Sequence, residues 1–201
     1  MNKRHAPEIN AGSMADIAFL LLIFFLVTTT MDTDSGILKK LPPKEKNAPQ
    51  IVIHDRNILE VKINQHNELM FDDQIIEPDE IKAIALNFID NGGGLDSYKQ
   101  PCTWCKGKKD KASSDHPSKA FISIQANRSS SYETYIKVMD EINKAYAVLR
   151  NRVSVSMYGQ NYTSLLESLK VKPENGEEIM VKITTIRSKY PLLVADTEIS
   201  N

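Results

Sequence analysis

One carboxylate, Asp16, lies in the longest apolar stretch of the sequence, which covers residues 13–31. An aspartate among apolar side chains is neutral where water is excluded and ionised where it meets water, so it can bind and release a proton. An aspartate near a helix start can instead cap free amide groups or reach lipid headgroups, because the helix dipole favours negative charge there. The position of Asp16 alone leaves both interpretations open.

The two cysteines of the chain, Cys102 and Cys105, lie in a segment rich in Gly, Lys and Ser. Their spacing suits a small disulfide in an oxidising compartment, half of a metal site with His116, or a redox pair. Zinc needs four ligands and only His116 is near, whereas a redox pair is expected where a helix follows a strand. We therefore predict a structural disulfide, with thiols that merely pack against Trp104 as the simpler alternative.

Other catalytic or ligand-binding patterns are missing from the sequence. It contains no Ser/His/Asp arrangement, Gly-rich phosphate loop or paired metal carboxylates, so we expect no enzyme, no metal and no cofactor. The 25 Lys and Arg residues balance the 26 Asp and Glu residues, which argues against a nucleic-acid partner. The lysines of residues 106–111 are expected to form a solvated loop.

The apolar stretch is long enough to be a membrane helix. Residues 15–31 would rise roughly 25 Å as a helix, a marginal span for a hydrocarbon core of about 30 Å. Lys3 and Arg4 resemble the basic start of a signal peptide, but no Ala-x-Ala-like cleavage site follows Val27, which favours a retained anchor. The basic residues before the helix and the acidic ones after it favour a cytoplasmic N-terminus, so the remainder would lie outside the inner membrane.

Asp16 shares one face of the expected helix with a set of residues spaced three or four apart: Leu20, Ile23, Val27 and Thr30. A carboxylate that faced lipid on an isolated helix would cost about 2.5–3.5 kcal/mol. We therefore expect partner helices or a water-lined cavity to receive this face within the lipid bilayer.

We predict an α+β protein with one transmembrane helix and a small outer domain whose helices cover one face of a β-sheet. The expected segments are a cytoplasmic tail (1–12), the transmembrane helix (13–31), an extended linker (32–50), the α+β domain (51–158) with an insert (91–119), and a C-terminal extension of uncertain structure (159–201). The insert has little apolar content, so we expect a surface loop.

Within the outer domain, hydrophobic periodicity predicts the individual elements. The expected strands are 51–53, 58–63, 68–71, 120–125, 153–157 and 191–195; the expected helices are 78–89, 130–149, 162–169 and 175–189. Ser130 and Glu133 suggest a capping box for the second helix.

Three features together resemble the ExbD and TolR proteins. Asp16 follows Asn10 by six positions and opens an Ile/Leu/Phe-rich helix, a linker with Leu41-Pro42 follows, and residues 121–142 read FISIQANRSSSYETYIKVMDEI. The resemblance covers roughly residues 8–158, broken by the insert. Many members have proline at the position of Ser13, so this helix would start without that stiff corner.

The resemblance implies a role in energy transduction. Asp16 would be the proton-binding residue of a motor in which a ring of an ExbB- or TolQ-type multi-span protein surrounds a homodimer of this subunit. The periplasmic domain would pass motion to a TonB-type protein. Leu41-Pro42 would either bind back onto that domain as an added strand or be an ordinary Leu-Pro pair, which is common in charged linkers. We expect an ExbD-like role, with TolR-type envelope maintenance, or a membrane-tethered binding or redox module using the insert, as alternatives.

Overall fold

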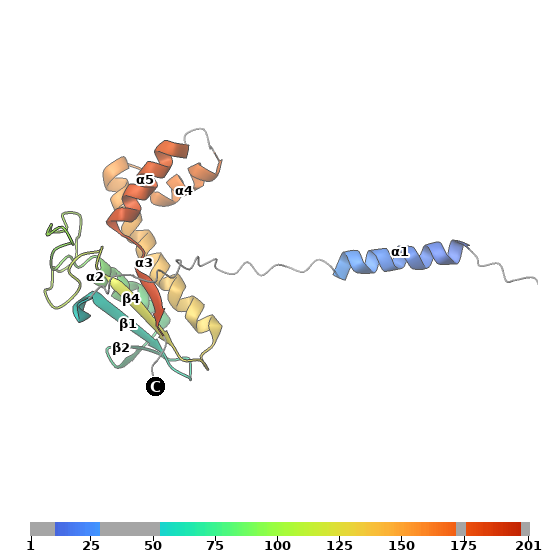
Figure 1. The fold of residues 1–201 in the computed structure, drawn as a ribbon, viewed down its shortest axis with the longest axis horizontal. Coiled ribbons are helices and arrows are strands. Elements are labelled where there is room, and N and C mark those ends of the chain that lie inside the picture. The colour runs from blue at the N-terminus through green and yellow to red at the C-terminus, as the bar shows by residue number, and fades with distance from the viewer. Residues whose placement is uncertain (1–10, 29–52, 172–175, 198–201) are drawn as a thin grey trace, which may run out of the picture. The chain divides into compact units, whose positions relative to one another are not determined.

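The computed structural model describes residues 11–28, 53–171 and 176–197, and it divides the chain into two units, Met1–Pro49 and Gln50–Asn201 (Figure 1). The described part of the first unit is one helix, α1 (Ala11–Thr28), and all other described elements belong to the second unit.

Helix α1 has 18 residues and a length of about 27 Å at 1.5 Å per residue. Its sequence after Asp16 is an unbroken run of apolar residues up to Val27, without glycine or proline, which favours a helix. Among the residues that the structure describes, no helix combines the length and the apolar character needed to cross a membrane. The predicted span reached residue 31, and residues 29–31 lie outside the described residues.

The second unit is built on a five-stranded mixed sheet with the order β3-β2-β1-β4-β5 (Figure 1). Its strands are β1 (Ile58–Ile63), β2 (Leu69–Phe71), β3 (Gln74–Ile76), β4 (Phe121–Ala126) and β5 (Val194–Thr197). The first three form antiparallel pairs, while β4 runs parallel to both β1 and β5.

Turn residues fix the antiparallel part of the sheet. Between β1 and β2, the Asn64 side-chain oxygen accepts hydrogen bonds from the backbone amides of His66 and Glu68, both at 2.9 Å. Between β2 and β3, Asp72 and Asp73 both have positive φ, at 48° and 59°, as a two-residue hairpin turn requires. The predicted hairpin is confirmed, but β3 was not expected because three residues carry too little pattern.

Helices α2 (Pro78–Ile89) and α3 (Tyr132–Tyr158) pack against each other and cover one face of this sheet (Figure 1). Alternate residues of β1 supply the core side of the sheet: Leu59, Val61 and Ile63 are buried, whereas Glu60 between them is exposed. Pro78 occupies the first turn of α2, where its missing N–H has no helical partner to lose. The α+β architecture predicted from periodicity is confirmed.

Helix α3 is longer than the sequence predicted. Residues 153–157 were expected as a strand, which is wrong, because they form the last turns of α3 and Val153 continues the buried stripe four positions after Leu149. The helix ends at Gly159, whose φ of 68° is the left-handed conformation that favours glycine. At the other end Ser131, one residue after the expected Ser130, caps the helix by accepting a bond from the Thr134 amide at 3.2 Å.

The residues after 158 belong to the same unit as the sheet. Helices α4 (Tyr162–Val171) and α5 (Gly176–Lys189) share a small apolar cluster of their own, and β5 then pairs with β4. The strand expected at 191–195 lies instead at Val194–Thr197. The strand expected at 51–53 is not seen at Ile53, and Ile51 and Val52 lie outside the described residues.

Candidate functional site

Asp16 lies in the second turn of α1. The helix begins at Ala11 and has no acidic residue in its first turn, so Asp16 is too far along to cap the free amides of the helix start. Its side chain is exposed, as are those of Leu20 and Ile23 on the same face. The side chain of Val27 and all of Thr30, Leu41 and Pro42 lie outside the described residues.

The apolar side chains of α1 point in every direction around the helix axis. Those on its described length leave 41–61% of their surface exposed, and they are Met14, Ile17, Phe19, Leu20, Leu21, Leu22, Ile23, Phe24 and Phe25. A helix that is apolar on all sides needs apolar surroundings, such as partner helices or lipid. Asp16 is the single charged residue of this helix, so those surroundings must also accommodate a carboxylate.

The insert, residues 91–119, is not the loose surface loop that its composition predicted. Buried polar contacts hold it against the start of β1. The backbone amide of Asp115 donates to the Asn57 side chain at 2.7 Å, and the Asp115 carboxylate accepts from Asn57 at 3.0 Å and pairs with Arg56 at 2.8 Å. Such contacts give no hydrophobic signal, which is why the sequence did not reveal this order.

A second anchor of the insert is Asn91, which is 2% exposed. Its side-chain amide donates to the carbonyls of Asp110 and Ser114 at 2.8 and 2.7 Å, and its oxygen accepts from the Asp110 amide at 2.9 Å. Gly107 approaches the Asp90 backbone so closely that a Cβ would overlap the Asp90 carbonyl oxygen. The insert is therefore held at both ends and in its middle.

The two cysteines form a disulfide in the structure, with their Cα atoms 5.6 Å apart. Both are buried, and the left-handed Gly92 packs against them. His116 does not join them: its Nδ1 contacts the Ser118 hydroxyl at 2.8 Å, and its ring meets the edge of Trp104. Among the described residues, no group of His, Cys, Asp and Glu is arranged to hold a metal ion.

A buried ionic cluster ties the insert to the helices. The Asp90 carboxylate at the end of α2 accepts from Arg152 of α3 at 2.5 Å and from the Tyr190 hydroxyl at 2.6 Å. Arg152 also donates to the Tyr190 oxygen at 2.7 Å, and the other Asp90 oxygen accepts from the Lys106 amide of the insert. Burial, followed by the neighbouring Asp90 carboxylate, raises the pKa of Tyr190.

The sequence did not identify this cluster. Asp90 directly follows the apolar stripe of α2 and Tyr190 directly follows α5, so each resembled an ordinary helix-end residue. Their pairing depends on a packing of α2, α3 and α5 that no local pattern encodes.

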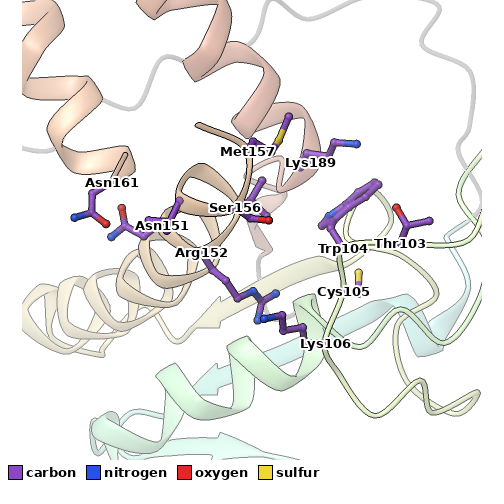
Figure 2. A pocket seen from close by; sticks show the side chains of 12 residues that line it. Thr103, Trp104, Cys105, Lys106, Asn151, Arg152, Ser156, Met157, Asn161 and Lys189 are labelled. Carbon is purple, nitrogen blue, oxygen red and sulfur yellow. The ribbon is translucent and has the colours of Figure 1, made fainter. Parts of the chain in front are cut away.

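An open cavity of about 830 Å³ lies beside the disulfide (Figure 2). Its walls come from the insert, the last turns of α3, the start of α4 and the end of α5; the lining residues are Thr103, Trp104, Cys105, Lys106, Asn151, Arg152, Val153, Val155, Ser156, Met157, Asn161 and Lys189. Figure 2 shows Trp104 and Lys189 on one side and the two asparagines on the other.

The sequence of the chain matches a known protein family. The family model described as "Biopolymer transport protein ExbD/TolR" matches residues 2–150. The chain belongs to the ExbD/TolR family. A search of curated proteins finds no match. The expected family is confirmed, and the chain is thereby assigned to biopolymer transport in the cell envelope rather than to a class of enzymes.

The ExbD/TolR match includes Asp16, the whole insert and most of α3, and it ends before Asn151. Family membership implies membrane-complex partners of the ExbB/TolQ and TonB kind in general. The last turns of α3, together with α4, α5 and β5, follow the matched segment.

His116 should make this ExbD/TolR-family domain less stable in mild acid. Burial lowers the pKa of His116, although the Asp96 carboxylate opposes this; Lys119 and Lys189 lower it further. A histidine binds protons more readily in the unfolded chain, so stability is full above the ordinary pKa of about 6.5 and falls as pH drops below it. In melting curves at pH 7.5 and pH 5.5, His116→Gln should lose less stability than the parent chain.

The matched control is His66→Gln, which changes an exposed turn histidine and should behave as the parent chain does. An equal acid sensitivity of the parent chain and His116→Gln would contradict the assignment of this effect to His116.

Proposed function

We propose that this chain is an ExbD-like subunit that uses the proton-motive force, with Asp16 as the residue that binds and releases protons. The supporting observation is the position of Asp16: the family match includes it, and it lies past the first turn of a helix that is apolar on all sides. There the carboxylate cannot serve as a helix cap, so a proton-binding role explains it better.

The proposed topology is a single pass through the inner membrane, with residues before α1 in the cytoplasm and the second unit in the periplasm. Lys3 and Arg4 precede α1 and Asp32 and Asp34 follow it, in line with the excess of basic residues on the cytoplasmic side. A disulfide in the insert suits the periplasm, where thiols are kept oxidised.

The proposed partners follow from the needs of α1. A ring of an ExbB-type multi-span protein around a homodimer of this chain would cover the apolar surface of α1 and supply a polar site for Asp16. A drop of 100 mV delivers about 2.3 kcal/mol for each charge moved, enough to bias a two-state assembly. The sheet domain would pass the resulting motion to a TonB-type protein that energises outer-membrane import.

TolR-type envelope maintenance is the near alternative, because the family match covers both kinds of protein. Purification of the full chain from its native membrane in mild detergent separates the two. An ExbB-type multi-span protein in the complex supports the proposal, whereas a TolQ-type protein replaces it with the TolR-type role.

A third possibility is a binding or redox module that α1 merely tethers. Two variants distinguish it from the motor: replacement of residues 12–31 by an inert apolar membrane helix, and the double change Cys102→Ser with Cys105→Ser. We expect energised import to be lost with the inert helix and retained with the double serine, because proton binding needs Asp16 and not the disulfide. Import is measured in cells that lack their own copy of the gene, and membrane levels of each variant are the control.

The opposite result, full activity with the inert helix and loss with the double serine, would replace the motor with the tethered module.

A further inference from the structure

The cavity beside the disulfide has an unusual charge for a chain that is neutral overall. Lys106, Arg152 and Lys189 line it, and none of its lining residues is Asp or Glu, although the chain has 26 acidic residues. Arg152 is already paired with Asp90. Within the part of the chain that the structure describes, neither lysine ammonium forms a salt bridge with a carboxylate.

Trp104, one of the lining residues, also carries an unused hydrogen-bond donor. The indole Nε1 of Trp104 is shielded from solvent and has no hydrogen-bond partner among the described residues. A buried N–H without an acceptor is uncommon and costs stability, so it calls for an explanation. The Lys189 ammonium lies 3.7 Å from the centre of the same ring, so a positive charge and a free donor meet at Trp104.

The cavity is also lined by apolar side chains. Val155 and Met157 line the cavity with 49% and 45% of their surface exposed, on the last turns of α3. Figure 2 shows Met157 and Ser156 between Lys189 and the two asparagines. An inorganic anion would not use this apolar surface, whereas a ligand with an apolar body would.

We propose that this cavity binds a carboxylate that carries an apolar body. The carboxylate lies at Trp104 between Lys106 and Lys189, and the body rests on Val155 and Met157. Nε1 is shielded, so its donation to a carboxylate oxygen requires the indole to turn toward the cavity. Such a ligand is either a small free acid or the C-terminal residue of a peptide, which share this chemistry.

Part of the cavity wall lies outside the segment that the family model matches. The walls come from the insert and from residues 151–189, and the latter follow the segment that the family model matches. The disulfide between Cys102 and Cys105 closes a short loop that contains Trp104. This loop of the insert forms one wall of the cavity. All of the lining residues belong to the second unit, whereas Asp16 belongs to the first.

Trp104 is the only tryptophan of the chain, so its fluorescence reports on the cavity directly. The full chain in detergent micelles is titrated at pH 7 with hexanoate, with N-acetyl-Ala-Leu bearing a free carboxylate, with the amide of each, and with inorganic phosphate. We expect a saturable change with at least one of the two acids, and binding at least about tenfold weaker for its amide and for phosphate.

Saturation by hexanoate alone identifies a small acid as the ligand type, and saturation by the peptide alone identifies a peptide end; both support the proposal. Three results would overturn it: equal binding of an acid and its amide, phosphate binding as tight as that of the acids, or the failure of both acids to give a saturable change up to about 10 mM.

Charge-neutral variants locate the site. Lys106→Gln and Lys189→Gln should each weaken binding of the acid about three- to tenfold and leave the amide unchanged. Lys108→Gln is the matched control, since this exposed lysine of the same insert does not line the cavity. Circular dichroism checks that each variant is folded, and Lys106→Gln changes only an exposed side chain. An equal loss with Lys108→Gln would show that the charges act from a distance, and would overturn the site.

Discussion

Replacement of Asp16 with asparagine should abolish energised import and leave the protein in its membrane complex. Asparagine has nearly the same shape and size as aspartate, so packing around α1 is kept, but the amide cannot bind and release a proton at physiological pH. The assay measures import of a substrate that cells without this gene no longer take up. Because no other residue of α1 ionises, we expect import at the level of the gene deletion.

Two comparisons make this result specific. Asp16→Glu keeps a carboxylate and should retain part of the activity, which a purely structural role for the residue would not explain. Co-purification of the multi-span partner with Asp16→Asn shows that the complex still forms. Import at the parent level in Asp16→Asn would refute the proton-binding role.

Removal of the Asp90 side chain should cause a large loss of stability in the sheet domain. Asp90→Ala leaves the Arg152 charge and the Tyr190 hydroxyl without their shared acceptor, and Tyr190 is fully buried. Loss of one partner from a buried pair costs about 3–5 kcal/mol, and the partial exposure of Arg152 reduces this to about 3 kcal/mol. Urea unfolding of the full chain, followed by Trp104 fluorescence, measures the change.

Graded controls belong to the same experiment. Tyr190→Phe removes the two hydrogen bonds of the hydroxyl, to Asp90 and from Arg152, and leaves the ion pair, so it should cost about 1–2 kcal/mol. Asp140→Ala removes an exposed carboxylate from α3 and should change the free energy of unfolding by less than about 0.5 kcal/mol. A result for Asp90→Ala as small as that for Asp140→Ala would show that the cluster does not hold the insert and helices together.

Local patterns were enough to predict much of the fold. The apolar stripes of α2 and the first turns of α3, the hairpin of β1 and β2, and the helical spacing in α4 and α5 all have a period that one segment displays by itself. The errors lie where a segment is short or ambiguous. Residues 153–157 alternate apolar and polar side chains as a strand would, but they continue the buried stripe of α3.

Among the candidate sites, too, only those with a local sequence signal could be predicted. Asp16 was recognisable because a carboxylate in an apolar run is locally unusual. The Asp90 cluster and the cavity were not, because their residues come from segments far apart in sequence: Trp104 from the insert, Arg152 from α3 and Lys189 from α5. The order of the insert was also hidden, since Asn57, Asn91 and Asp115 stabilise it through polar contacts that resemble solvated loop residues in a sequence.

The position of β5 constrains the time at which the sheet domain can fold. Val194 pairs with Ile122, so the parallel pairing of β4 and β5 forms only after α3, α4 and α5 have been synthesised. Contacts this distant in sequence close large loops and slow folding. During synthesis, β4 therefore has one unpaired edge until the chain beyond residue 193 is available. In the proposed topology, where the domain would cross the membrane as an unfolded chain, this delay would keep it competent for translocation until β5 is available.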